Sequence, residues 1–347
     1  MIDLRSDTLT VPDSAMLESI LTARLGDDGR PNGSGRGEDE TTNQLEDYAA
    51  QLIGKDAGLF FSSGTLANTC ALLTWCSPGD GVLVDALQHI YRSEKAAFAP
   101  HWGQLVPQVY RYSAANCPDV PHMEGLLSES NSRLICLENT HNARGGAVIP
   151  LETMGSVRKL ADQFSVPVHM DGARIFNAAH ALKIDARELC SYADSVMFCV
   201  SKGLRAPVGS LLCGSTEFIC RARATRKLLG GNMRQCGVIA APALYALRHN
   251  IADLCNDNRN ALIFSDALKP LRIGRVQPCV ESNIVMLDVS PYGLSADEYC
   301  NILGQRGVLA SIGNIHQVRF VFYCGISQAD SRNAAAILLK LEQDLSR

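Results

Sequence analysis

Short apolar runs alternate with segments of helical periodicity through the middle of the chain, and no other feature constrains the fold as strongly. Each run is too short to form a helix and is bounded by turn-forming residues, so we predict a strand for each. Strands that alternate with helices indicate an α/β architecture with a mainly parallel sheet covered on both faces. The predicted strands are Gly58–Phe61, Gly81–Asp85, Leu105–Tyr110, Arg133–Glu138, Val166–Met170, Ser195–Val200 and Gly209–Cys213. The predicted helices are Thr41–Ile53, Thr65–Trp75, Leu151–Phe164, Glu217–Leu229, Ser295–Arg306 and Gln328–Leu345.

The C-terminal part of the chain has a different order of elements. One long helical stretch over Cys236–Leu268 is predicted to lead out of the large domain. Strands at Asn283–Asp288 and Val318–Tyr323 then alternate with the last two predicted helices, which indicates a small α+β domain. A chain of 347 residues favours one large and one smaller domain. We expect an N-terminal arm over residues 1–25, a large domain over 26–245 and a small domain over 246–347.

The composition excludes several classes of protein. With 46% hydrophobic and 20% charged residues, the chain can bury a large core and is not disordered. Its net charge of -4 argues against a nucleic-acid partner or an anionic membrane surface, and no apolar stretch is as long as a membrane span. The 13 cysteines are scattered without a Cys-x-x-Cys pair, which favours reduced buried thiols over disulfides or a zinc site. The N-terminus has no signal-peptide pattern, so we expect a soluble cytoplasmic protein without a bound metal.

Two charged residues follow apolar strands and form a chemically meaningful pair. Lys202 comes directly after one predicted strand, and Asp171 ends another. Burial disfavours the ammonium form of a lysine and lowers its pKa, which prepares the amine to react with a carbonyl group. Pyridoxal phosphate (PLP) chemistry needs such a lysine together with a carboxylate that faces the pyridine nitrogen. A lysine after a strand is by itself more often a solvated strand end, so the interpretation depends on Asp171 and on the loops described next.

The segment Ser62–Asn68 lies between a predicted strand and a predicted helix. Small residues at a helix start leave free N–H groups and hydroxyls that point at one place, which is typical of a phosphate site. Gly64 and Thr65 are the candidate donors. An ordinary N-cap, with Ser63 or Thr65 capping the helix, explains the same residues equally well.

Two histidines and two arginines complete the candidate site. His89 follows the strand Gly81–Asp85 and could cover the pyridine ring, although a surface histidine at a helix start is an equal alternative. His141 follows another strand, and its neutral form could move a proton near pH 7. Arg174 and Arg319 can each bind a carboxylate, although an arginine that opens a strand is usually only exposed.

The ordered motifs resemble the L-threonine aldolase family, in particular its low-specificity type. The resemblance covers nearly the whole chain and implies a PLP-dependent enzyme of fold type I, with a mainly parallel seven-stranded sheet and a small C-terminal α+β domain. The motifs that carry it are Ile2–Thr8, Gly26–Asp28, Gly37–Asp39, Ser63–Asn68, Glu138–Asn142, His169–Asn177, Ser201–Ser210 and Arg226–Gln235.

The resemblance implies a role for each candidate residue. Lys202 would bind PLP covalently, Asp171 would keep the pyridine nitrogen protonated, His89 would stack on the ring and His141 would lie beside the substrate β-hydroxyl. Lys227 and Arg234 would reach the cofactor phosphate of a neighbouring subunit in a homotetramer with shared active sites. The phosphate contacts within the chain would come from Ser63, Gly64 and Thr65, and the contacts to the small-molecule substrate's carboxylate from Ser6, Arg174 and Arg319, with Arg174 also close to the cofactor.

By the same resemblance, the expected reaction is reversible cleavage of L-threonine, L-allo-threonine and related β-hydroxy-α-amino acids to glycine and an aldehyde. Another PLP-dependent elimination or transaldolase reaction, or a non-catalytic PLP-binding homologue, stays an alternative. The base that removes the β-hydroxyl proton is left open between His141, His89 and a phosphate-bound water. The chain departs from the family between Asp28 and Gly37, where the loop is longer and glycine-rich and has Arg36 at the position of a tyrosine. We therefore expect a mobile loop that alters the substrate entrance.

Overall fold

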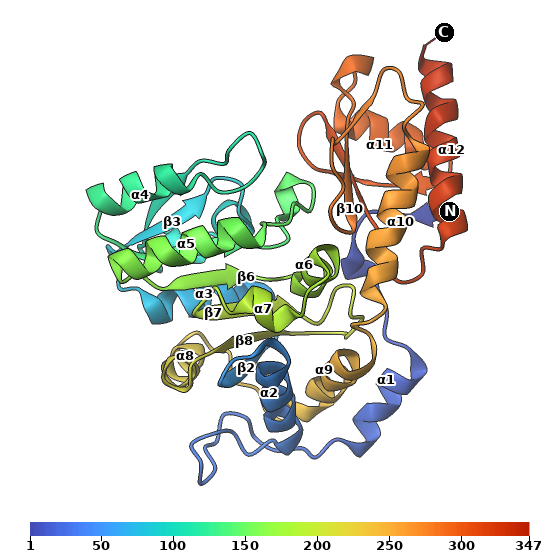
Figure 1. Ribbon diagram of the computed structural model, residues 1–347. Helices are drawn as coiled ribbons and strands as arrows, with labels where there is room; N and C mark the ends of the chain where they lie inside the picture. Colours follow the sequence, from blue (N-terminus) through green and yellow to red (C-terminus); the bar gives the residue numbers. More distant parts are fainter. Residues whose placement is uncertain (347) are drawn as a thin grey trace.

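A computed structural model describes residues 1–346 of the chain, and it has a larger and a smaller sheet (Figure 1). The larger sheet has seven strands in the order β2-β8-β7-β6-β5-β3-β4. Every predicted strand is present here, with bounds that differ from the prediction by at most two residues. The strands are β2 (Ala57–Phe61), β8 (Ser210–Gly214), β7 (Ser195–Cys199), β6 (Val168–Asp171), β5 (Ser132–Glu138), β3 (Gly81–Asp85) and β4 (Val106–Tyr110).

The sheet is mainly parallel, as predicted. Strands β7, β6, β5, β3 and β4 are parallel to one another, whereas β8 is antiparallel to both of its neighbours, β7 and β2. All strands except β8 therefore point the same way, and their carboxyl ends meet at one edge. In open α/β sheets this edge is where ligands bind.

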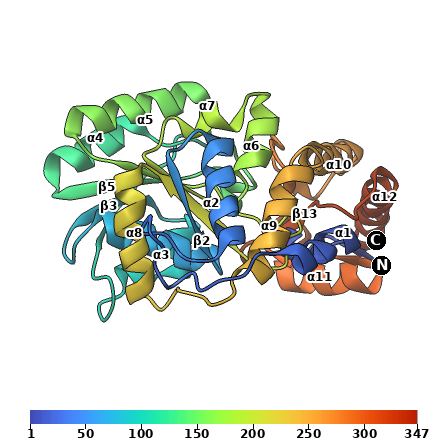
Figure 2. The same cartoon turned by 90° about the horizontal axis from the view of Figure 1, so that it is seen from below.

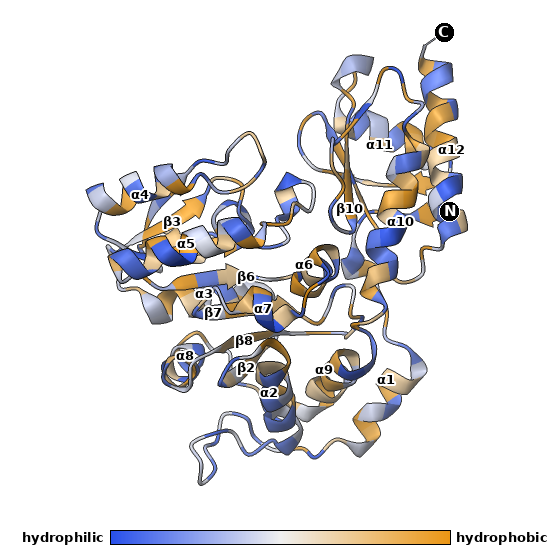
Figure 3. Cartoon of the chain, viewed as in Figure 1, coloured by the Kyte–Doolittle hydropathy of each residue, from blue (hydrophilic) through white to orange (hydrophobic). Residues whose placement is uncertain are grey.

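Alternate residues of each strand pack on opposite faces of the sheet. In β7, Val196 and Phe198 belong to one hydrophobic core, and Met197 and Cys199 belong to another. Because both faces are covered, β3 and β7 are buried along their whole length, and the middle of each is apolar (Figure 3 shows this for β3). One face is covered by α2 (Glu40–Ile53), α5 (Leu151–Phe164), α6 (Ile175–Leu182) and α9 (Gly237–His249), and the other by α3 (Gly64–Trp75) and α8 (Thr216–Leu228).

The smaller sheet is antiparallel and has the order β12-β13-β10-β9. Its core includes Phe264, Phe320 and Phe322, which pack against one another with ring centroids 5.0 and 5.2 Å from that of Phe264. The elements are β9 (Arg275–Val276), β10 (Ile284–Asp288), β12 (Ser311–Ile312), β13 (Gln317–Val321), α10 (Leu254–Ala267), α11 (Ala296–Gln305) and α12 (Gln328–Leu345).

The first residues of the chain also belong to this smaller unit. Strand β1 (Ile2–Asp3) pairs in parallel with β11 (Val308–Leu309), and Leu4 lies in the same core as Phe264. The two chain ends consequently lie on the smaller unit (Figure 1). The chain then passes through a 3-10 turn (Asp7–Leu9) and α1 (Ser14–Glu18) to the larger sheet. The domain bounds expected from the sequence stay a prediction.

The long helical stretch predicted over residues 236–268 is wrong in one respect, because the chain forms two helices, α9 and α10, with a break between them. Figure 2 shows α9 beside α2 and α10 on the side of the smaller unit. At the break, Asn250 Nδ2 donates to the backbone oxygen of Leu204 (2.9 Å), and this contact fixes the turn. Helices α1, α4 (Val120–Glu129), α6 and α7 (Ala186–Cys190) were not predicted, although Asp119 caps α4 and a proline follows at the second residue of the helix, which is typical of a helix start.

Candidate active site

A cavity of about 370 Å³ lies where the carboxyl-end edge of the larger sheet faces the smaller unit. Its lining comes from the ends of β2, β5, β6 and β7, from the N-terminal segment and from β13. Most of the predicted site residues meet here, namely Ser6, Ser63, Gly64, Thr65, His89, Asp171, Arg174, Lys202 and Arg319.

Lys202 and Asp171 follow neighbouring parallel strands, so they reach the cavity from the same edge. Asp171 is the last residue of β6 and is buried, with a relative exposure of 2%. Its Oδ2 accepts from Asn68 Nδ2 (3.0 Å) and its Oδ1 from the backbone N–H of Ala173 (3.1 Å). Lys202 is half-buried, and its backbone oxygen accepts from Thr10 Oγ1 (2.7 Å). The two groups that PLP chemistry requires therefore share one cavity.

Helix α3 begins at the cavity. Ser63 is its N-cap and accepts from the backbone N–H of Leu66 (3.2 Å), so the capping interpretation is confirmed. The first helical hydrogen bond runs from Ala67 N to Ser63 O (3.1 Å), which leaves the N–H groups of Gly64 and Thr65 without an acceptor inside the helix. A Cβ at Gly64 would lie 3.2 Å from Cys199 Sγ, so glycine lets α3 start this close to β7. Phosphate binding by this helix start stays a prediction.

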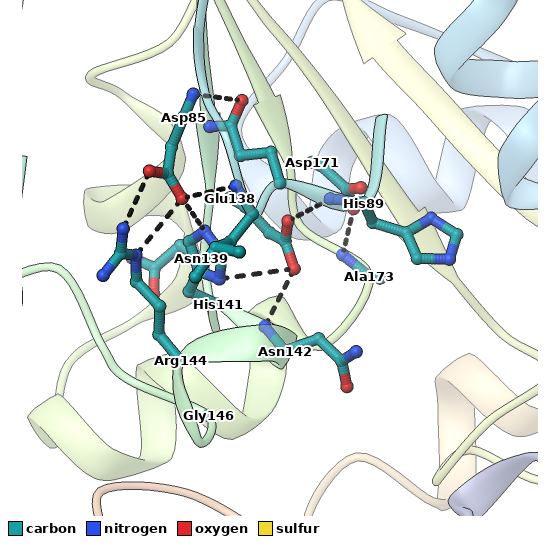
Figure 4. A network of polar contacts seen from close by, with 12 residues as sticks. Asp85, His89, Glu138, Asn139, His141, Asn142, Arg144, Gly146, Asp171 and Ala173 are labelled. Atoms are coloured by element: carbon teal, nitrogen blue, oxygen red, sulfur yellow. Dashed lines mark hydrogen bonds and ion pairs between the residues drawn. The ribbon is translucent and has the colours of Figure 1, made fainter. Parts of the chain in front are cut away.

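Glu138 was not predicted to be a site residue, but its side chain connects two of the segments that line the cavity. Its buried carboxylate accepts from the backbone N–H of His89 through Oε2 (2.7 Å) and from that of Asn142 through Oε1 (2.8 Å) (Figure 4). A usable signal existed, because Glu138 ends β5 as Asp171 ends β6. Acids at the ends of neighbouring parallel strands reach the same edge.

The two predicted carboxylate-binding arginines have different partners. Arg174 is buried and binds Asp7 with both arms of its guanidinium, at 2.6 Å from Nε and 2.9 Å from Nη2. Arg319 donates to Asn142 Oδ1 (3.0 Å) and to Ser311 Oγ (3.2 Å), and it has no carboxylate partner among residues 1–346.

The charge around Arg319 would suit a bound anion. Burial and the neighbouring Arg174 guanidinium lower the pKa of Arg319, so an anion placed between the two would offset both effects. Ser6 lies on the same wall, where its hydroxyl is hydrogen-bonded to Thr8 Oγ1 (2.8 Å).

Three predicted residues do not line the cavity. His141 is fully buried behind the wall, and its Nε2 is bound to Asp85 Oδ2 (3.0 Å), the carboxylate that also accepts from Arg144 (2.8 Å) (Figure 4). Lys227 and Arg234 are exposed, and Arg234 Nε lies 3.6 Å from Asp27 Oδ2. The roles expected for these three residues stay predictions.

The long loop between Asp28 and Gly37 also stays away from the cavity of its own chain. Arg36, at the position of the expected tyrosine, binds Asp47 (2.7 Å) and Glu46 (3.3 Å) on α2. Asn32 Oδ1 accepts from the hydroxyl of Ser34 (2.7 Å) and closes the loop on itself. An effect on the substrate entrance would therefore need a second subunit.

Comparison with known proteins agrees with the fold. The model of the family described as beta-eliminating lyase matches residues 3–290. The low specificity L-threonine aldolase of Escherichia coli K12 is 37% identical and covers 97% of this chain and 98% of its own length. Low-specificity L-threonine aldolase 1 of Arabidopsis thaliana is 36% identical, over 95% of this chain and 93% of its own length.

The chain therefore belongs to the beta-eliminating lyase family and, within it, to the low-specificity L-threonine aldolases. The resemblance predicted from the sequence is confirmed. A solved structure of Leishmania major threonine aldolase has a TM-score of 0.80 and 15% identity, and it covers 99% of this chain and 100% of its own, which supports the predicted fold class. Among residues 1–346, no helix combines the length and apolar character needed to cross a membrane.

Proposed function

We propose that this protein is a PLP-dependent aldolase. It cleaves L-threonine, L-allo-threonine and related β-hydroxy-α-amino acids reversibly to glycine and an aldehyde, which is acetaldehyde for threonine. The observation that carries the proposal is the meeting of Lys202, Asp171, the start of α3 and Arg319, which has no carboxylate partner among residues 1–346, around one cavity. The names of the E. coli and Arabidopsis relatives support it.

The residues present fit the cofactor. The buried Asp171 carboxylate suits a protonated ring nitrogen, and the free N–H groups of Gly64 and Thr65 suit a phosphate. Lys202 would hold the cofactor through its amine, and His89 would cover the ring. When bound, PLP supplies an electron sink for the negative charge that remains on Cα once the bond to Cβ breaks.

The residues of the chain would orient the substrate and move its proton. Arg319 would bind the substrate carboxylate, with Ser6 beside it and with Arg174 held in place by Asp7. Removal of the β-hydroxyl proton by a positioned base is typically worth about 10²–10⁴-fold in rate. Of the two predicted histidines, only His89 lines the cavity.

We further propose a cytoplasmic homotetramer with shared active sites. Lys227 and Arg234 lie exposed on the surface, where they are accessible to the site of a neighbouring subunit. All 13 cysteines are free, which suits a reducing compartment.

Release of acetaldehyde and formation of glycine from L-threonine and L-allo-threonine test the proposal. We expect both products from the purified protein with PLP, and we expect Lys202→Ala to lose this turnover and the visible cofactor absorbance between about 400 and 430 nm. Lys159→Ala, at an exposed lysine on α5, is the matched control and should keep both. Wild-type turnover in Lys202→Ala would remove the central assignment.

The family description favours a second candidate, β-elimination. That reaction gives an α-keto acid and ammonia instead of glycine and an aldehyde. Product analysis by chromatography therefore separates the two candidates in the same experiment.

A further inference from the structure

Glu94 lies in the cavity wall although no sequence motif pointed to it. Its side chain is almost fully buried, with a relative exposure of 4%. Its Oε1 is 2.9 Å from His89 Nδ1 and accepts from Asn68 Nδ2 (3.1 Å). The same Asn68 amide nitrogen donates to Asp171 Oδ2 (3.0 Å), so one amide group joins the two carboxylates.

The two carboxylates fix which way the Asn68 amide points, because only its nitrogen can donate to them, and a row of buried polar groups continues from its oxygen. His169 is fully buried, with Nε2 3.2 Å from Asn68 Oδ1 and Nδ1 2.9 Å from Ser195 Oγ. Because an amide oxygen only accepts, the His169 proton must be on Nε2. Nδ1 then accepts from the Ser195 hydroxyl, whose oxygen accepts from Trp75 Nε1 (2.9 Å). Burial lowers the pKa of His169 to about 4, so the ring stays neutral and this direction is kept at neutral pH.

These hydrogen bonds affect the protonation of His89. A proton between Nδ1 and the Glu94 carboxylate leaves Nε2 as the ring nitrogen free to face the cavity. The hydrogen bond to Glu94 raises the pKa of His89, as do the nearby charges of Asp171 and Glu138, while burial raises the pKa of Glu94. Both shifts favour retention of a proton in the pair.

The other charged groups on this cavity are cations. Lys202 and Arg174 come from the ends of β7 and β6, and Arg319 comes from β13. The hydrogen bond to Glu94 has the largest effect on the pKa of His89, so the carboxylate of Glu94 dominates its charge state.

We propose that Glu94 is a positioning residue of the active site. Together with Asn68, it sets the plane and the protonation of His89 relative to Asp171, so that Nε2 of His89 faces the bound substrate. Its part in the reaction rests on the proposed function, whereas its control of His89 does not.

A divalent cation held by the same groups is a competing explanation. Donor atoms of His89, Glu94 and Asp171 all lie within 4.8 Å of one another. However, the Asn68 amide donates to an oxygen of each carboxylate, so its positive end occupies the space between them. Hydrogen-bond donors there repel a cation, and the arrangement favours the polar network.

Titration of His89 in the cofactor-free protein tests the proposal directly. Proton NMR of histidine ring signals, assigned with His89→Asn, gives the pKa of His89. We expect Glu94→Gln to lower this pKa, and we expect Glu129→Gln, at an exposed acid that ends α4, to leave it unchanged. An unchanged pKa in a folded Glu94→Gln protein overturns the proposal.

Two further measurements keep the test decisive. If Glu94→Gln does not fold, Glu94→Asp keeps the charge on a shorter side chain and should lower the pKa of His89 as the contact lengthens, whereas an unchanged value again refutes the proposal. In the PLP-loaded enzyme, the limb of the kcat/KM profile that belongs to His89 should move to lower pH in Glu94→Gln, and a limb that stays in place contradicts the role in the reaction. Absence of aldehyde release in the wild type would refute the proposed function alone.

Discussion

Asp257 offers a test of the physical reasoning that does not depend on the reaction. It lies on α10 with a relative exposure of 3%, and its side chain has no hydrogen bond or ion pair with any residue in 1–346. It lines a cavity of about 300 Å³ beside Gly203. Burial, together with the smaller effects of the nearby Asp7 and Asp253 carboxylates, raises its pKa to about 8. The perturbation we choose is Asp257→Asn, which keeps the shape and removes the titration.

The direction and the size of the effect on the free energy of unfolding follow from the linkage between protonation and folding. Between the ordinary pKa of 3.8 and about 8, folded Asp257 keeps its proton whereas the unfolded chain has lost it. The unfolded state thus binds fewer protons, so this group lowers the free energy of unfolding as pH rises through that window. The pKa of Asp257 differs by about four units between the folded and unfolded states, and each unit is worth about 1.36 kcal/mol. The free energy of unfolding can therefore fall by at most about 5 kcal/mol. Water that enters the adjoining cavity would reduce the desolvation, so we expect a smaller loss, of at least about 1.4 kcal/mol between pH 5 and pH 8.

Urea unfolding at pH 5, 6.5 and 8 measures the effect. The free energy of unfolding of Asp257→Asn minus that of the wild type should increase with pH. Asp266→Asn, at an exposed acid on the same helix, should show no such trend. Parallel pH dependences for the wild type and Asp257→Asn would refute the assignment of a buried neutral carboxyl.

Substitutions of Arg319 and Arg226 are expected to change KM and the free energy of unfolding, respectively. Arg319→Ala should raise KM for amino acids roughly tenfold or more, because a charge-assisted contact is worth about 1.5–3 kcal/mol, and Arg275→Ala, at an exposed arginine on β9, is the control. An unchanged KM would place the carboxylate site elsewhere. Arg226→Leu should cost about 3–5 kcal/mol in urea unfolding, because it removes the closer partner of buried Asp28, at 2.6 Å, and leaves only Arg223, at 3.8 Å. Adding Asp28→Asn should restore most of this loss, and a single-variant cost below about 1 kcal/mol would contradict the account.

The sequence predicts the elements well wherever burial is continuous. Leu151–Phe164 and Gln328–Leu345 have the predicted bounds, because their apolar period ends at clear turn signals. Lys202 and Asp171 could be paired for a similar reason. Each follows an apolar strand, and parallel strands end at one edge, so two sequence positions far apart define one place.

Partners between distant segments could not be predicted in this way. Arg174 looks equally suited to a substrate carboxylate and to Asp7, and only the structure shows that Asp7 holds it. His141 looks like a site residue, yet Asp85 binds it behind the wall. Glu94 lies in a short π-helical turn without an apolar period, so nothing in its surroundings marks it as buried. Residue type and strand order predict where the backbone places a side chain. The partner that this side chain binds depends on how distant segments pack together.

The N-terminal segment shows how the two units act on one site. Residues 2–4 are part of the smaller unit, yet Asp7 binds Arg174 on the larger one and Thr10 binds the backbone of Lys202. Arg319, from the smaller unit, would fix the substrate carboxylate, while Lys202 would hold the reacting end of the cofactor. A shift of one unit against the other would therefore change the distance between the carboxylate site and the bond to be broken, and rates are sensitive to such displacements. The N-terminal segment bonds to both units, and so it helps to set this distance, together with the direct bond from Arg319 to Asn142.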